Sequence, residues 1–143
     1  MEMDELYQDI ILDHYRNPRQ AGTVEDEELL VEEENPLCGD QIRLTAVIAN
    51  GQVKDIRYQA RGCAISMASA SMMTEDLIGK PIEEVRARIH DFVELMRSER
   101  EIPEDELGDL IALEGVKHFP MRIKCATLCW HAAELALEKL GQK

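Results

Sequence analysis

Apolar and polar residues alternate in two neighbouring stretches of the chain, residues 41–49 and 53–60. Every second residue from Ile42 to Ile48 is apolar, which is the spacing of a strand that buries one face. Asn50-Gly51 separates the two stretches, and both residues tolerate the positive φ of a tight hairpin turn. The sequence therefore predicts an antiparallel hairpin. The acidic stretch 29–33 is predicted as a short edge strand.

The rest of the chain has apolar residues at helical spacing. Asn17-Pro18 ends the first of these helical segments, because a residue before proline avoids the helical region. The predicted helices span residues 4–15, 64–78, 81–98, 107–113 and 123–140. These elements favour an α+β fold, in which a small three-stranded antiparallel sheet is covered by a cluster of about five helices. We expect a single domain over residues 1–143.

Charge limits the partners that the chain can have. Its 143 residues include 16 Lys and Arg against 29 Asp and Glu, a net charge of −13. This surface would repel phosphate backbones and anionic membranes, so we expect neither nucleic acid nor a membrane as a partner, and we favour a protein with a basic patch. Residues 1–10 do not resemble a secretory signal, and no apolar run approaches the roughly 18 residues of a membrane span. We therefore expect a cytoplasmic protein.

The four cysteines are the main candidates for chemistry. An even number of cysteines could form two disulfides, but a reducing cytoplasm favours metal binding or catalysis. Cys38 precedes the first hairpin strand and Cys63 follows the second, and an antiparallel hairpin brings these far ends together. Cys125 cannot be placed from the sequence alone. Cysteines that are simply packed in the core remain an alternative.

The local settings of these cysteines favour thiolates. Cys63 and Cys125 are predicted in the first turns of helices, where the helix dipole lowers a thiol pKa. Asp40, two residues after Cys38, adds a carboxylate. Three thiolates and one carboxylate suit tetrahedral zinc, although thiolates also bind iron and copper. Because a carboxylate is the weaker partner for soft metals, Asp40 is predicted to leave the metal more readily than the cysteines.

Four segments of the chain carry a resemblance to a known family. They are residues 5–19 (ELYQDIILDHYRNPR), 35–40 (NPLCGD), 61–73 (RGCAISMASASMM) and 122–132 (RIKCATLCWHA). Together they resemble the SufU branch of the IscU/NifU N-terminal family over nearly the whole chain. The resemblance implies a SufE/NifU-like α+β fold with metal ligands at Cys38, Asp40, Cys63 and Cys125. IscU-type chains usually have a histidine where this chain has Lys124, and they are shorter before the last ligand.

This resemblance also implies a function. SufU-type proteins resemble zinc-dependent sulfurtransferases, which take persulfide sulfur from a pyridoxal-phosphate cysteine desulfurase and pass it toward downstream iron–sulfur scaffold proteins. Cys38 would be the sulfur acceptor. The alternatives are a scaffold on which a transient [2Fe–2S] cluster is assembled and transferred, and a structural zinc domain without chemistry. We expect a monomer or weak dimer, and leave open whether the chain is an enzyme in its own right.

The remaining reactive side chains are interpreted as structural or accessory. Cys129 lies one helical turn after Cys125 and is interpreted as a packed residue, with an additional ligand or a resolving thiol as the alternative. Arg122 and Lys124 flank the predicted site and are candidates to balance its negative charge. The four histidines are interpreted as ordinary polar residues that do not bind the metal: His14, His90, His118 and His131.

Overall fold

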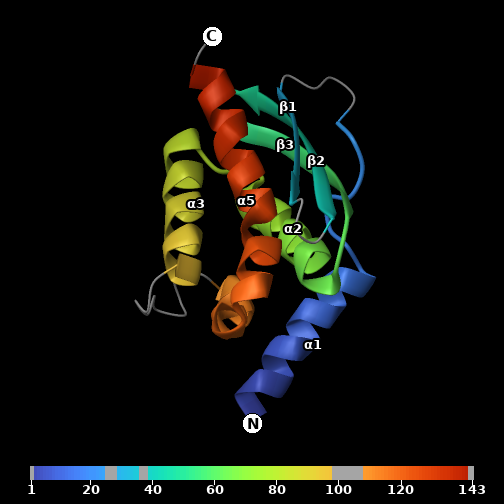
Figure 1. Cartoon of the computed structure of the whole chain (residues 1–143). Helices are drawn as coiled ribbons and strands as arrows, with labels where there is room; N and C mark the ends of the chain where they lie inside the picture. The colour runs from blue at the N-terminus through green and yellow to red at the C-terminus, as the bar shows by residue number, and fades with distance from the viewer. Residues whose placement is uncertain (1, 25–28, 36–38, 98–107, 142–143) are drawn as a thin grey trace.

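A computed structural model describes residues 2–24, 29–35, 39–97 and 108–141 (Figure 1). Three strands form one sheet, and helices lie along one face of it. In chain order the elements are α1 (Glu2–Arg16), β1 (Leu29–Asn35), β2 (Asp40–Ala49), β3 (Gln52–Arg61), α2 (Ala64–Leu77), α3 (Ile82–Arg97), the 3₁₀ helix η1 (Gly108–His118) and α5 (Pro120–Gly141).

The predicted hairpin is confirmed and forms the centre of the sheet. The strand order is β1-β2-β3, and both neighbouring pairs are antiparallel. Asn50 and Gly51 both have positive φ, 54° and 72°, which lets β2 return directly as β3. The register shifts by one residue between Val47 and Ile48, where the ladder is irregular. The predicted edge strand is also confirmed, as β1.

Helices α2 and α5 cover one face of the sheet, and α3 packs on the outer side of α5 (Figure 1). The aromatic rings of Phe92 on α3 and Trp130 on α5 are stacked, with their centroids 4.3 Å apart, and both side chains are fully buried. Helix α1 packs against α2, and His14 ties the two helices together through a 2.9 Å hydrogen bond between its Nδ1 and Ser71 Oγ. The core therefore lies between the helices and the inner face of the sheet.

The helices differ from the prediction in two places. Among the described residues there are four α-helices, and the segment predicted as a short helix at 107–113 is the 3₁₀ helix η1. Helix α5 begins at Pro120, three residues before its predicted start, because a proline fits the first turn of a helix without losing a hydrogen bond. A search of the described residues for a helix long and apolar enough to cross a membrane finds none.

Candidate metal centre

Three of the four predicted ligands come together at one end of the sheet. The ligand atoms of Asp40, Cys63 and Cys125 all lie within 4.8 Å of one another. Asp40 begins β2, Cys63 precedes α2, and Cys125 lies on α5. Asp40 and Cys125 are almost completely buried, with 2% and 1% of their surface exposed, whereas Cys63 is partly exposed. This spacing fits one metal ion bound by two thiolates and a carboxylate.

Cys63 is the N-cap residue of α2. Its extended backbone (φ −73°, ψ 169°) directs its sulfur back over the first turn, where the Ser66 N–H donates to Sγ at 3.5 Å. The N-terminal end of a helix carries a partial positive charge, which stabilises a thiolate. Cys63 therefore lies at the start of a helix, as predicted.

The setting of Cys125 differs from the prediction. Because α5 begins at Pro120, Cys125 lies in the second turn of the helix rather than the first. The effect of a helix dipole falls off within the first turn, so it stabilises the Cys125 thiolate less than predicted. Arg122 supplies a positive charge nearby. Its hydrogen bond with Cys125, followed by the charge of Cys63, raises the pKa of the Arg122 guanidinium above its ordinary value.

The Asp40 carboxylate is fixed by the backbone that carries Cys63. Its Oδ1 accepts a hydrogen bond from the Cys63 N–H at 3.2 Å, and its Oδ2 lies 4.0 Å from Cys63 Sγ. Oδ1 is thus bound to the backbone, and Oδ2 faces the Cys63 sulfur. That Asp40 leaves the metal more readily than the cysteines stays a prediction.

Gly62 makes this arrangement possible, although its role was not predicted from the sequence. A Cβ atom at residue 62 would lie 2.3 Å from Asp40 Oδ1 and 2.7 Å from Asp40 Cγ. These distances are too short for any non-bonded pair, so a larger residue would displace the carboxylate. The only signal in the sequence is a glycine directly before a candidate ligand. Gly62 is therefore a positioning residue for Asp40.

Cys38 lies outside the described residues, and its part in the site stays a prediction. The chain on both sides of it is held together. Asn35 pairs with Asp40 between β1 and β2, and the Gly39 N–H donates to the Asn35 carbonyl at 2.8 Å. Cys38 is thus two residues along the chain from a member of the group.

Arg122 lies beside both sulfurs, which supports its predicted role in balancing their charge. Arg122→Gln is expected to lower zinc affinity several-fold, because the guanidinium offsets part of the negative charge that the ligands bring together. A zinc-competition titration with a chromophoric chelator would measure the loss. Lys124 is also exposed but makes no ion pair within the described residues, so Lys124→Gln is the matched control. Equal affinities for the two variants would contradict the role of Arg122.

Cys129 does not belong to the group. Its sulfur lies in the core, 3.5 Å from Ser69 Oγ, and Ser69 also accepts a hydrogen bond from the Trp130 indole at 3.1 Å. Burial raises the pKa of Cys129 to about 12, so it is a neutral thiol at physiological pH. This agrees with its interpretation as a packed residue and argues against a resolving thiol, which must ionise to react.

Burial also predicts the order in which the cysteines react. Among the three cysteines that the structure describes, we expect iodoacetamide to modify Cys63 first in metal-free protein, Cys125 more slowly, and Cys129 only after unfolding. Peptide mass spectrometry of timed samples would measure the three rates. Modification of Cys129 in folded protein as fast as that of Cys63 would contradict the buried, neutral thiol.

The histidines described by the structure lie away from the group. His14 is buried between α1 and α2, and His90 and His131 are exposed on α3 and α5, where each faces a neighbouring carboxylate at 3.8 Å. The side chain of His118 lies outside the described residues. Within the described part of the chain, the cluster that can hold a metal contains only Asp40, Cys63 and Cys125.

The fold and this group define a class of protein, a small α+β domain with an Asp-Cys-Cys metal site at one end of its sheet. The model of the NifU-like N-terminal domain matches residues 6–126, and the chain belongs to this family. It is 45% identical, over 96% of its length and 92% of the relative, to the zinc-dependent sulfurtransferase SufU of Bacillus subtilis. The family inferred from the sequence motifs is thereby confirmed.

Other relatives are described as scaffolds. The chain is 38% identical, over 96% of its length and 86% of the relative, to the iron–sulfur cluster assembly scaffold protein IscU of Streptococcus pyogenes. Its fold matches a crystal structure from Fervidobacterium islandicum with a TM-score of 0.86 and 32% identity, covering 93% of this chain and 97% of the other. That protein is assigned to the SUF system as a cluster assembly scaffold. The predicted α+β class is confirmed by this match.

Proposed function

We propose that this protein is a zinc-dependent sulfurtransferase of iron–sulfur cluster assembly, which accepts persulfide sulfur from a cysteine desulfurase. The observation that carries the proposal is the convergence of Asp40, Cys63 and Cys125, whose ligand atoms lie within 4.8 Å of one another. Two sulfurs and one oxygen at this spacing suit zinc, and Cys38 would complete a tetrahedral set. The similarity to the Bacillus SufU, a zinc-dependent sulfurtransferase by name, supports the same activity here.

Zinc bound at this site would keep its sulfur ligands deprotonated near neutral pH. The chain contributes the geometry that such a site requires. The N-cap position of Cys63 directs its sulfur over the first turn of α2, and the Cys63 N–H orients the Asp40 carboxylate. Arg122 offsets part of the negative charge that three thiolates and a carboxylate bring together.

Sulfur transfer in this proposal is a thiol–disulfide type of exchange. The Cys38 thiolate attacks the outer sulfur of the persulfide on the desulfurase. The sulfur–sulfur bond of that persulfide breaks, and its electron pair leaves with the desulfurase cysteine as a thiolate. Cys38 then carries the persulfide, so no external oxidant or reductant is needed. A downstream scaffold protein would accept the sulfur in a second exchange.

The proposed partners follow from this chemistry. The donor is a pyridoxal-phosphate cysteine desulfurase, and the acceptor is a protein on which the cluster is built. Because a reducing compartment keeps cysteine thiols from forming disulfides, we place the reaction in the cytoplasm.

The test combines metal content with desulfurase turnover. We expect about one zinc per chain in anaerobically purified protein, and faster cysteine turnover by the desulfurase when the protein is added. Cys38→Ser is expected to abolish persulfide formation on this chain, whereas Cys129→Ser should retain it. Protein without zinc, or without any effect on the desulfurase, would contradict the proposal.

A scaffold function is the second candidate, favoured by the 38% identity to the Streptococcus scaffold protein IscU. Thiolates with one carboxylate can also hold iron. Anaerobic reconstitution with iron and sulfide, followed by transfer to an apo-ferredoxin, separates the two functions. A stable cluster that transfers intact would favour the scaffold, and rapid loss of iron to added zinc would favour the sulfurtransferase.

A further inference from the structure

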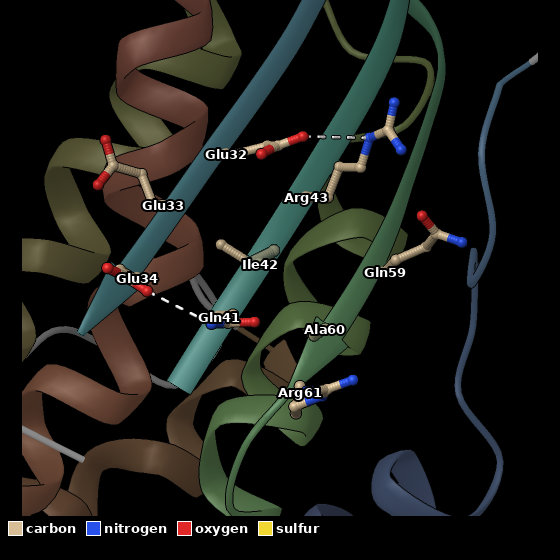
Figure 2. Close-up of a pocket in the computed structure, with 9 residues that line it drawn as sticks. All are labelled: Glu32, Glu33, Glu34, Gln41, Ile42, Arg43, Gln59, Ala60 and Arg61. Atoms are coloured by element: carbon tan, nitrogen blue, oxygen red, sulfur yellow. Dashed lines mark hydrogen bonds and ion pairs between the residues drawn. The ribbon is translucent and has the colours of Figure 1, made fainter. Parts of the chain in front are cut away.

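The outer face of the sheet, away from the helices, is hollowed at the end that carries the metal group. The hollow has a volume of about 630 Å³ and is lined by residues of all three strands (Figure 2). Farther along, residues 20–22 hydrogen-bond to the edge of β3 at Tyr58, and the Val24 N–H donates to the buried Thr45 Oγ1 at 3.0 Å. The hollow lies beyond this part of the face.

The charges in the hollow are divided by strand. β1 contributes Glu32 and Glu34, whereas β2 and β3 contribute Arg43 and Arg61 (Figure 2). Glu32 pairs with Arg43 at 3.7 Å, and Glu34 accepts a hydrogen bond from Gln41 at 3.3 Å. The surface is thus acidic along one edge and basic along the other.

Arg61 differs from Arg43 because it has no carboxylate partner among the described residues. It is exposed at the end of β3, in the same cross-strand row as Gln41 and Glu34. Its guanidinium forms no ion pair or hydrogen bond with any other described residue, although the chain carries a net charge of −13. An exposed arginine that forms no ion pair within an acidic protein is available to bind a carboxylate of another molecule.

The hollow and the metal group share one end of the β2–β3 pair. Gln41 directly follows Asp40, and Arg61 directly precedes Gly62 and Cys63. Because side chains alternate along a strand, Asp40 points inward and Gln41 outward, and only 2% of Asp40 is exposed. The metal group and the hollow therefore lie on opposite faces of the same end of the sheet, and a protein bound in the hollow would border the end of the sheet that carries the metal group.

We infer that the hollow is a docking surface for the sulfur-donating protein, and that it receives an extended segment of that protein with an acidic side chain facing Arg61 and a basic side chain facing Glu34. This inference rests on the proposed function. The mixed charge selects the occupant, because a polyanion would be repelled by Glu32 and Glu34, and a purely basic segment by Arg61. Glu34 and Arg61 lie two strand spacings apart, about 10 Å. Side chains at alternate positions of an extended segment are about 7 Å apart, so two long side chains of the partner can reach both residues.

Two opposite charge reversals test the docking surface. Arg61→Glu and Glu34→Lys are each expected to weaken binding of a purified pyridoxal-phosphate cysteine desulfurase from the same organism by about tenfold, because each places like charges together. Arg86→Glu, an exposed arginine on α3, is the matched control and is expected to change affinity less than twofold. Isothermal titration calorimetry with zinc-loaded proteins would give the three affinities, after equal zinc content has been verified.

The opposite signs of the reversals separate a specific surface from a general effect of net charge. If only net charge mattered, Arg61→Glu and Glu34→Lys would change affinity in opposite directions, and the inference would be wrong. It would also be wrong if both variants bound within twofold of the wild type, although the proposed function would then stand. Failure of the wild-type protein to bind the desulfurase would overturn both.

Discussion

Gly62→Ala is expected to lower zinc affinity about 10- to 100-fold, the usual cost of disturbing a group that orients a metal ligand. The added Cβ would lie 2.3 Å from Asp40 Oδ1, so the carboxylate must move. It would then lose its hydrogen bond from the Cys63 N–H and its position beside the sulfur. The φ of Gly62 is not in the left-handed region, so alanine meets no backbone strain there and the expected effect is steric.

Gly115→Ala is the matched control for this prediction, because no atom lies within 4 Å of a Cβ added there. Competition with a chelator would give the affinities, and the absorption bands of the cobalt-substituted protein would report the ligand geometry. In an Asp40→Ala background, Gly62→Ala should have little further effect, since the carboxylate that it displaces is absent. Equal zinc affinities for Gly62→Ala and Gly115→Ala would show that Gly62 does not act through Asp40.

The register of the hairpin explains why the sequence did not reveal this contact. Alternation from Ile42 to Ile48 and the Asn50-Gly51 turn were sufficient to predict β2 and β3. A regular ladder from that turn would place Asp40 opposite Arg61. The shift between Val47 and Ile48 moves the pairing by one residue, so that Gln41 pairs with Arg61 and Asp40 lies next to Gly62. Such an irregularity is decided by packing and leaves no local pattern in the sequence.

The metal group was only partly predictable for a related reason. Hairpin geometry predicted that Cys38 and Cys63 lie close together, because they flank the far ends of paired strands, and Asp40 is two residues from Cys38. Cys125 is 62 residues beyond Cys63, and its position depends on how α5 packs across the sheet. That packing involves buried contacts such as the hydrogen bond from the Trp130 indole to Ser69 on α2, which no spacing in the sequence encodes. The family resemblance was therefore the only guide to Cys125, whereas Cys38 stays a prediction from hairpin geometry and the resemblance together.

Cys129 is expected to make the protein sensitive to alkali. Burial raises its pKa to about 12, compared with 9.0 for an exposed thiol. Between these values the unfolded chain releases the thiol proton while the folded protein keeps it, so the unfolded state binds fewer protons and stability falls as pH rises. Below pH 9 the Cys129 thiol is neutral in both states, so its ionisation does not lower the stability of the folded protein. At about 1.4 kcal/mol per pH unit, the loss by pH 12 is about 4 kcal/mol, a large fraction of a typical free energy of unfolding.

Cys129→Ser should remove this loss, because serine keeps a small hydrogen-bonding group beside Ser69 that does not ionise in this range. Urea unfolding at pH 8, 9, 10 and 11, with both proteins in the same metal state, would measure the difference in slope. Burial also raises the pKa of Tyr58 above its usual 10.0, and Tyr58 is present in both proteins. The stability of the variant should therefore also fall with pH, but from about pH 10 rather than from about pH 9. Parallel stability curves for the two proteins from pH 8 to 11 would mean that the Cys129 thiol ionises as easily in the folded core as in the unfolded chain, and the packed interpretation of this residue would be wrong.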